Sequence, residues 1–459
     1  MLQAEARNRL INILGEDNFA DNQEELIAYS FDATKRQALP EAVVFPSTVE
    51  QVAQVLALAN QERIPVVPRG AGSGMSGGSV PVHGGIVLVL QGFDRILELD
   101  ADNLVAVVQP GVVTQKLQQA AQEKGLFYPP DPASMAFSSI GGNIAENSGG
   151  LRAVKYGVTR DYVLGLEVVL PNGQIIQTGS KCIKDVVGYN LTQLFVGSEG
   201  TLGVITQAIL RLLPLPKASQ TLSATFPSML AAANTVSEVL RQGLQPTAME
   251  FLDRASIWSV SHYLDLGLPE KTQAFLLVEL DGDPDLIQKN IQQVQEVCMS
   301  NQALQVNIAA DKKEQEELWR ARRSVSASLA HHGAVVKLNE DIVVPRASLP
   351  EMITAIEEMS SKSGILIANF GHAGDGNIHV NVLPKQESLD QARQAVRDIF
   401  AKTVELGGRI SGEHGIGLSK KEYIQMNLQP SALDLMRSIK QAVDPCNILN
   451  PGKILPNPE

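Results

Sequence analysis

Three glycine-rich loops constrain the fold of this chain more than any other feature. They read Arg-Gly-Ala-Gly-Ser-Gly-Met-Ser-Gly-Gly (69–78), Ser-Ser-Ile-Gly-Gly-Asn-Ile-Ala-Glu-Asn-Ser-Gly-Gly (138–150) and Gly-Ser-Glu-Gly-Thr-Leu-Gly (197–203). Clustered glycines let the backbone approach a ligand closely and turn several N–H groups toward it. One such loop could be a flexible surface segment. Three of them favour a large phosphate-bearing cofactor wrapped by many backbone donors.

The first loop has the spacing of a dinucleotide fingerprint but not its context. Gly72, Gly74 and Gly77 fit G-x-G-x-x-G. In a Rossmann fold, this turn opens a helix, and an acidic residue for the ribose follows ~20 residues later. Here residues 79–85 lead instead into a strand-like apolar run. We therefore exclude a Rossmann turn, and the lack of a GxxxxGK[ST] sequence argues against a P-loop nucleotidase.

Composition indicates a globular protein of two or three domains. The chain has 459 residues, of which 44% are hydrophobic and 19% charged. Its net charge is −12, without a dense basic run, so nucleic acid is not an expected partner. Cys182, Cys298 and Cys446 are too scattered for a disulfide framework or a cysteine-bound cluster. With neither a secretion signal nor a transmembrane segment recognised, we expect a cytoplasmic protein that reaches a membrane only through a partner.

Hydrophobic periodicity predicts alternating helices and strands. Ser47-Thr48-Val49-Glu50 fits a capping box with Ser47 as the N-cap, and Asn172-Gly173 predicts a hairpin turn. Pro214-Leu215-Pro216 is a candidate domain boundary, after which the pattern is βαβ-like. Helices are expected over 21–29, 114–124, 228–242, 286–301, 312–329 and 350–363, and strands over 64–67, 86–90, 96–99, 105–109, 163–170, 174–178, 274–280 and 335–338.

Four long strings resemble a known flavoprotein superfamily. PRGAGSGMSGG, PPDPASMAFSSIGGNIAENSGG, YGVTRDYVLGLEVVLPNG and LFVGSEGTLGVIT are similar to the FAD domain of the vanillyl-alcohol oxidase/PCMH superfamily. From about residue 40 onward, the chain resembles the D-2-hydroxyacid branch of that superfamily. This branch contains glycolate oxidase catalytic subunits, D-lactate dehydrogenases and D-2-hydroxyglutarate dehydrogenases.

The resemblance implies an α+β fold. Its expected parts are an N-terminal helical segment (1–37), a PCMH-type FAD-binding domain of two subdomains (38–217), a cap or substrate domain (218–410) and a C-terminal segment that returns to the FAD site (411–459). Some relatives attach FAD through a histidine in the first glycine loop. That loop has none here, and His83 beyond it is expected in an exposed turn, so we expect noncovalent FAD.

The resemblance also implies which residues contact FAD. They are Pro68, Arg69, Gly70, Ala71, Gly72, Ser73, Gly74, Ser76, Pro132, Ser139, Gly142, Asn143, Gly149, Gly150, Tyr156, Gly157, Gly200, Ile205 and Asn450.

Two histidines and a glutamate suggest a metal site. His372 and His379 flank a glycine turn, and His379 and Asn381 would share one face of a strand. With the carboxylate of Glu413 they would form an open site suited to Zn²⁺ or Fe²⁺. Alternatively, they only hydrogen-bond the glycine turns. The resemblance favours a divalent metal, Zn²⁺, Fe²⁺ or Mn²⁺, beside the flavin, with Asn381 contacting substrate and His414 acting as the base.

Cationic residues could hold the substrate carboxylate. The resemblance assigns this role to Arg322, Ser326 and Lys337, with Lys337 on the strand after Gly333. Alternatively, Arg322 is an exposed helix charge like its neighbours. The matching residue in 2-hydroxyglutarate enzymes is typically Thr rather than Ser326, and residues 339–342 look more like the glycolate/lactate type. The remaining histidines His262, His331 and His332 match no ligand position, and the last two are expected at a solvated helix end.

The resemblance implies FAD-dependent oxidation of a small D-2-hydroxy acid, D-lactate or glycolate, to the 2-oxo acid. The metal would lower the pKa of the substrate hydroxyl, His414 would take its proton, and hydride would pass to flavin N5. An electron-transfer flavoprotein, an iron–sulfur subunit or a quinone would accept the electrons. An oxidase that makes hydrogen peroxide is an alternative. Homodimers and hetero-complexes also stay open. The alternatives are a D-2-hydroxyglutarate dehydrogenase, a noncatalytic flavin electron-transfer subunit and a metallohydrolase.

Overall fold

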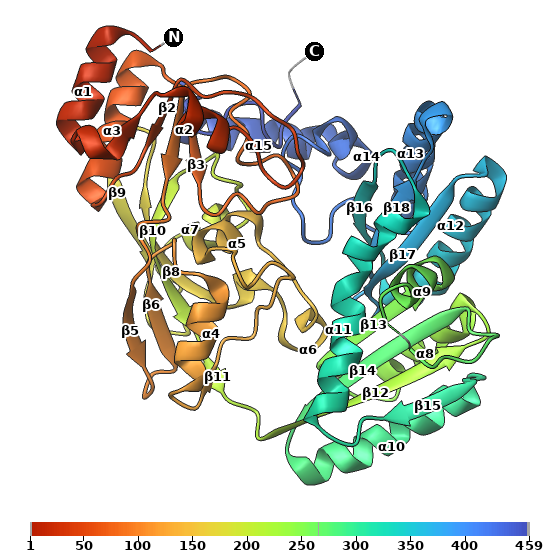
Figure 1. Cartoon of the computed structure of the whole chain (residues 1–459). Coiled ribbons are helices and arrows are strands. Elements are labelled where there is room, and N and C mark those ends of the chain that lie inside the picture. Colours follow the sequence, from red (N-terminus) through yellow and green to blue (C-terminus); the bar gives the residue numbers. More distant parts are fainter. Residues whose placement is uncertain (1, 265, 457–459) are drawn as a thin grey trace. The chain divides into compact units, whose positions relative to one another are not determined.

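The computed structural model describes residues 2–264 and 266–456, which form two compact units (Figure 1). Unit 1 comprises the chain up to Gly149, Val158–Leu215 and the segment from Glu413 onward. Unit 2 comprises Gly150–Gly157 and Pro216–Gly412. The sequence pattern did not anticipate that Gly150–Gly157, which begins at the last residue of the second glycine loop, groups with unit 2.

A mostly parallel sheet carries the first glycine loop of unit 1. Its strand order is β1-β2-β4-β3, and β4 pairs in parallel with both β2 and β3. The strands are β1 (Phe19–Ala20), β2 (Ala42–Val44), β3 (Val66–Arg69) and β4 (Ile86–Val89). β2 and β4 are buried throughout, as expected for parallel strands covered on both faces. The loop begins where β3 ends, and among the described residues between β3 and β4 no helix forms, which agrees with the exclusion of a Rossmann turn.

Helices α1 (Ala4–Leu14), α2 (Gln23–Ala28) and α3 (Val49–Glu62) flank this sheet. Leu10 and Leu56 pack with Leu88 in the main core of this subdomain. The predicted N-cap of α3 is wrong by one residue. Thr48, not Ser47, accepts the N–H of Gln51, while the N–H of Ser47 bonds the Gln51 side chain. Both hydroxyl residues favour N-caps, so the sequence could not separate them.

A second, antiparallel sheet of unit 1 has the order β5-β6-β10-β8-β9. As predicted, Asn172-Gly173 turns β8 into β9, with Gly173 at φ +85°. The final segment of the chain packs in unit 1, where the Asn450 side chain donates to the carbonyls of Gly78 and Glu199. The remaining elements are β5 (Ile96–Asp100), β6 (Val105–Val108), α4 (Thr114–Gln122), β7 (Leu126–Phe127), α5 (Ile140–Glu146), β8 (Val163–Val169), β9 (Ile175–Gly179), α7 (Leu191–Phe195), β10 (Val204–Arg211), β11 (Leu213–Pro214), α14 (Ile424–Asn427) and α15 (Pro430–Val443).

Unit 2 is built on a seven-stranded sheet of order β15-β12-β14-β13-β17-β18-β16. The strands are β12 (Ala218–Phe226), β13 (Ala248–Asp253), β14 (Ala274–Gly282), β15 (Gln305–Ile308), β16 (Leu338–Val343), β17 (Leu366–His372) and β18 (Asn377–Leu383). The helices are α6 (Ala153–Tyr156), α8 (Met229–Arg241), α9 (Arg254–Ser261), α10 (Pro284–Ser300), α11 (Lys312–Ser328), α12 (Leu349–Ser363) and α13 (Leu389–Glu405).

The βαβ-like expectation needs correction, because every neighbouring pair in this sheet is antiparallel. β12 and β13 run parallel and are joined through α8, but β14 lies between them. β16 and β17 are likewise joined through α12 and separated by β18. These are split βαβ units, in which a later strand fills the gap left by the crossover. The strand expected over 335–338 is also misplaced, since β16 begins at Leu338 and Lys337 precedes it.

Helices cover the two faces of this sheet differently (Figure 1). Helices α8, α10, α12 and α13 form one layer. Helices α9 and α11 pack on the opposite face, where Trp319 and Val325 of α11 meet Leu252 and Phe370. Directly paired residues of neighbouring antiparallel strands share a face. This second face therefore also carries Glu250, His372, His379 and Asn381.

Candidate functional site

The three glycine loops line one cavity within unit 1, with about 1300 Å³ of space that includes the open solvent at its mouth. At its wall, glycine permits close approach between backbones. A Cβ on Gly70 would lie 2.3 Å from Ser139 Oγ, so a side chain there would displace the hydroxyl that caps α5 in the second loop. Gly72 adopts φ +68°, which a side chain rarely tolerates. A cavity lined by glycine and small hydroxyl residues fits a large cofactor held through backbone donors.

Most of the residues expected to contact FAD line this cavity. They are Pro68, Arg69, Gly70, Ala71, Gly72, Ser73, Gly74, Pro132, Ser139, Gly142, Asn143, Gly200, Ile205 and Asn450. Ser76 and Gly149 lie just behind it: Ser76 donates to Glu146, and a Cβ on Gly149 would meet the Glu413 carboxylate. Gly150, Tyr156 and Gly157 fall in unit 2, where the Tyr156 hydroxyl donates to Asp281 at 2.9 Å.

Two carboxylates of unit 1, buried Glu199 and half-buried Glu146, were missed by the sequence reasoning. Glu199 accepts the backbone N–H groups of Ile416 and Gly417, each at 2.8 Å, and burial raises its pKa to about 7. Glu146 accepts from Ser76 at 3.1 Å. Both carboxylates line the cavity, and a Cβ added to Gly415 would meet an oxygen of each, Glu146 Oε2 at 2.1 Å and Glu199 Oε1 at 3.0 Å. The glycine loops thereby hold the segment that directly follows His414, although more than 200 residues separate the two in sequence.

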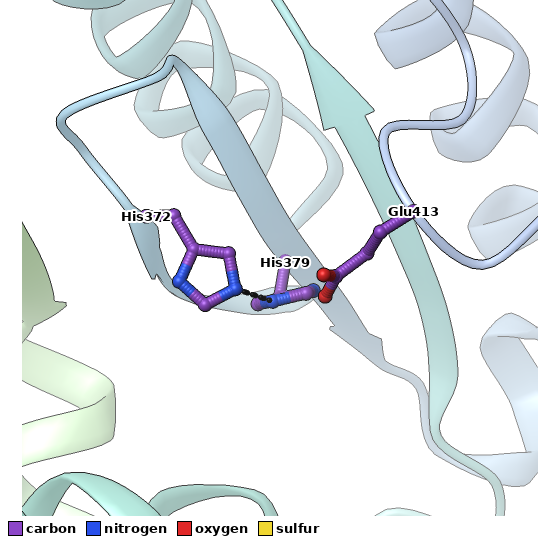
Figure 2. Close-up of side chains that lie close together, drawn as sticks. All are labelled: His372, His379 and Glu413. Atoms are coloured by element: carbon purple, nitrogen blue, oxygen red, sulfur yellow. Dashed lines mark hydrogen bonds between the residues drawn. The ribbon is translucent and has the colours of Figure 1, made fainter. Parts of the chain in front are cut away.

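In unit 2, the two predicted histidine ligands face one another. His372 ends β17 and His379 lies on β18, and both side chains are buried. Their Nε2 atoms are 3.3 Å apart. Figure 2 marks this contact between the two rings with a dashed line. His372 Nδ1 lies 2.6 Å from Glu250 Oε1, so this ring binds a carboxylate rather than a glycine turn. Glu250 was not predicted, because β13 lies far from both histidines in sequence.

Glu413 follows Gly412, the last residue of unit 2. Asp341, the register partner of His379, accepts the backbone N–H of Gly412 at 2.9 Å and the hydroxyl of Ser411 at 3.2 Å. These bonds fix the chain immediately before Glu413. One ligand atom each of His372, His379 and Glu413 lies within 4.8 Å of the others (Figure 2).

This donor set fits a divalent cation. Two nitrogens that bind one tetrahedral Zn²⁺ at ~2.0–2.1 Å lie ~3.3 Å apart, which is the separation of the two Nε2 atoms. A carboxylate as third ligand leaves one position open, which is the arrangement of catalytic rather than structural zinc.

The residues expected at the substrate carboxylate form two groups on and beside α11. Arg322 is buried, not exposed, and its Nη2 lies 2.6 Å from Glu250 Oε2. Lys337 Nζ donates to the Ser326 hydroxyl at 2.8 Å, so these two residues are neighbours. Asn381 is fully buried, and its Oδ1 accepts no hydrogen bond from the described residues. Such an acceptor suits a donor from a bound molecule.

His414 lies beside Glu413, with Nε2 at 3.8 Å from Glu413 Oε1, and both residues line the unit 1 cavity. The other histidines agree with their expected places outside the site. His83 is exposed in a turn, and His331 and His332 end a helix, where they contact the rings of His262 and Trp258.

Comparison with known proteins decides the family. A model described as "FAD linked oxidases, C-terminal domain" matches residues 215–454, and an "FAD binding domain" model matches residues 40–179. The chain belongs to the FAD-linked oxidase family. FAD is therefore its cofactor, and the chain is an FAD-dependent oxidoreductase, as the sequence resemblance implied.

Curated relatives match over nearly the whole chain. The glycolate oxidase subunit GlcD of Bacillus subtilis (strain 168) is 44% identical over 99% of this chain and 97% of its own length. The D-lactate dehydrogenase of Archaeoglobus fulgidus is 40% identical over 93% of this chain and 95% of its own. The D-lactate dehydrogenase of Anaerostipes hadrus is 37% identical over 91% and 90%.

Solved structures confirm the α+β fold. Substrate-bound p-cresol methylhydroxylase superposes with a TM-score of 0.79 at 20% identity, over 98% of this chain and 96% of that one. Alkyldihydroxyacetonephosphate synthase gives a TM-score of 0.77, also at 20% identity, over 99% and 85%. Within the described residues, no helix combines the length and the apolar character needed to cross a bilayer.

Proposed function

We propose that this FAD-dependent enzyme oxidises a small D-2-hydroxy acid, D-lactate or glycolate, to the 2-oxo acid, with a divalent metal at His372, His379 and Glu413. The observation that carries the proposal is the cluster of these three side chains, with His414 next in sequence and Asn381 on the same strand face as His379. Relatives named as a glycolate oxidase subunit and as D-lactate dehydrogenases support this substrate class.

Each group has a distinct role in the proposal. When bound, FAD accepts the hydride from C2, and the cation acts as a Lewis acid toward the substrate hydroxyl. His414 removes the hydroxyl proton as general base. The buried, unsatisfied Oδ1 of Asn381 accepts a hydrogen bond from the substrate.

In this proposal, the substrate carboxylate binds Lys337 and Arg322 of unit 2. Lys337, held by the Ser326 hydroxyl, supplies a positive charge, and Arg322 supplies a second donor group. The Arg322 charge is already balanced by Glu250, so this pair adds little net positive charge. We infer that the site suits a substrate with one carboxylate better than one with two, which favours lactate or glycolate over 2-hydroxyglutarate.

FAD is held without a covalent bond in this proposal, because residues 69–78 contain no histidine. Acid precipitation should release the yellow flavin into the supernatant. An electron-transfer flavoprotein, an iron–sulfur subunit or a quinone would serve as the electron acceptor that reoxidises the bound FAD.

Turnover with an artificial electron acceptor tests the substrate class. The panel contains glycolate and the D- and L-forms of lactate and 2-hydroxyglutarate. We expect kcat/KM to be highest for D-lactate or glycolate, with L-lactate at least tenfold poorer than D-lactate. A preference for L-lactate, or turnover of none of these acids, would contradict the proposal.

A further inference from the structure

The carboxylate of Glu250 contacts both a proposed metal ligand, His372, and a proposed substrate-binding residue, Arg322. Glu250 lies on β13 as the register partner of His372 and is fully buried. Its Oε1 lies 2.6 Å from His372 Nδ1. Its Oε2 accepts from Arg322 Nε at 2.7 Å and lies 2.6 Å from Nη2. One carboxylate oxygen thus binds the proposed metal ligand, and the other binds the proposed substrate-binding arginine.

The contact to His372 defines what that ring offers to a cation. A carboxylate accepts hydrogen bonds, so His372 presents its Nδ1–H to Glu250. The lone pair of Nε2 then faces His379, where a metal would bind. A carboxylate behind a metal-binding histidine fixes the tautomer and the ring orientation of that ligand.

The contact to Arg322 fixes a second side chain. Two guanidinium nitrogens bind the carboxylate, and the guanidinium carbon lies 4.8 Å from the centre of the Phe370 ring. A buried arginine that loses its carboxylate partner is left as an uncompensated charge and must move or draw in water. The orientation of Arg322 therefore depends on Glu250.

We propose that Glu250 is a positioning residue that holds His372 for the metal and Arg322 for the substrate at the same time. This inference rests on the proposed function, because it takes the metal and the substrate carboxylate from it. It adds that the affinity for the metal and the affinity for the substrate both depend on the Glu250 side chain.

Glu279 offers a matched control. It lies on the neighbouring strand β14, on the same sheet face, and accepts from Trp319 Nε1 of α11 at 2.9 Å. Glu250 and Glu279 are thus largely buried glutamates that bind the same helix. Glu279 differs in its lack of a contact to His372 or Arg322 among the hydrogen bonds of the described residues.

The experiment measures Zn²⁺ affinity of the metal-free, FAD-bound protein by competition with a chromophoric chelator. Loss of such a supporting carboxylate typically weakens metal binding ~10–100-fold. We expect this loss for Glu250→Gln and an unchanged affinity for Glu279→Gln. At saturating Zn²⁺, Glu250→Gln should still show a KM raised at least fivefold, because Arg322 loses its charged partner, with a smaller change in kcat.

Two results would overturn the inference while leaving the proposed function intact: Glu250→Gln binding Zn²⁺ as tightly as wild type, or an unchanged KM at saturating Zn²⁺. Wild-type protein that binds no Zn²⁺ would instead overturn both. If Glu250→Gln does not fold, the double variant Glu250→Gln/Arg322→Met, which removes both buried charges, replaces it. The double variant must bind Zn²⁺ at least tenfold more weakly than wild type, and equal affinity would overturn the inference.

Discussion

At the scale of single residues, buried carboxylates outside the proposed ligand set fix the backbone that carries Glu413 and His414. Asp341 binds the backbone just before Glu413, and Glu199 binds the backbone two residues after His414. Adjacent residues of an extended segment point to opposite sides, so a short segment held at both ends is needed to aim both groups usefully. Gly415, at φ +84°, turns the chain directly after His414.

Replacing His414 with Asn should slow flavin reduction while both cofactors stay bound. Loss of a general base typically costs ~10²–10⁴-fold in rate. The asparagine keeps a similar size, so FAD and metal content should match wild type. The defect should ease at high pH, where the substrate hydroxyl ionises with less help. Anaerobic stopped-flow measurement of flavin bleaching checks the rate.

Two results of the His414→Asn experiment would contradict the assignment. Bleaching at the wild-type rate would exclude His414 as the base. Loss of metal from the variant would identify His414 as a ligand and exchange the roles within the Glu413-His414 pair.

At the scale of elements, the three loops form the cofactor site because glycine lets them touch. Gly70→Ala should therefore weaken FAD binding at least tenfold, since the new Cβ would lie 2.3 Å from Ser139 Oγ. Gly92→Ala is a matched control, because Gly92 lies in a nearby turn and its added Cβ would meet nothing within 4 Å. Flavin retained after extensive dialysis measures both. Equal retention by the two variants would contradict the close-packed loop arrangement.

We predict that Asp253 makes the stability of unit 2 depend on pH. It caps α9 and also accepts the backbone N–H of Asn369 at 2.6 Å, and burial raises its pKa from 3.8 to about 6. An acid with a raised pKa contributes stability that is fully present below its unfolded pKa and is lost as pH rises through the folded value. The loss should therefore occur between about pH 4 and pH 6, and the pKa difference corresponds to about 3 kcal/mol.

The Asp253→Asn variant tests this pH dependence, because its side chain does not ionise. Replacing an acceptor oxygen by NH₂ destabilises the variant by a constant amount. Relative to wild type, its free energy of unfolding should then improve as pH rises from 4 to 7. Denaturant unfolding at a series of pH values gives the difference. A difference independent of pH would show that folding does not shift the Asp253 pKa. A difference moving the other way would show that the N–H donors of Ser256 and Asn369 lower this pKa more than burial raises it.

The sequence predicted local elements better than their pairing. Apart from the strand expected over 335–338, the helices and strands that periodicity predicted lie within a few residues of their predicted ranges, and Asn172-Gly173 specified its own hairpin. It could not show that β14 and β18 insert between crossover-linked strands, because nothing in a βαβ pattern says which later strand fills the gap. Glu250 was missed for the same reason, since only the pairing of β13 with β17 places it beside His372.

At the scale of the whole molecule, the resemblance to a known family predicted the cofactor and favoured a metal site, which residue spacing alone did not. Residue spacing alone left His372, His379 and Glu413 open between a metal site and hydrogen bonds to glycine turns. The family motifs favoured a metal, and the facing Nε2 atoms now support that proposal. The family and its FAD cofactor follow from matches over most of the chain. The substrate, the metal and the electron acceptor stay proposals.

The most direct test of the central claim is anaerobic reduction of the bound flavin by D-lactate, with and without metal. Protein stripped of metal by a chelator should keep its FAD and stay yellow when D-lactate is added. Adding back Zn²⁺ or Mn²⁺ should restore bleaching, and His372→Ala should not respond to either ion. Rapid bleaching of demonstrably metal-free protein would contradict the account, because the substrate hydroxyl would then be activated without the His372, His379 and Glu413 site.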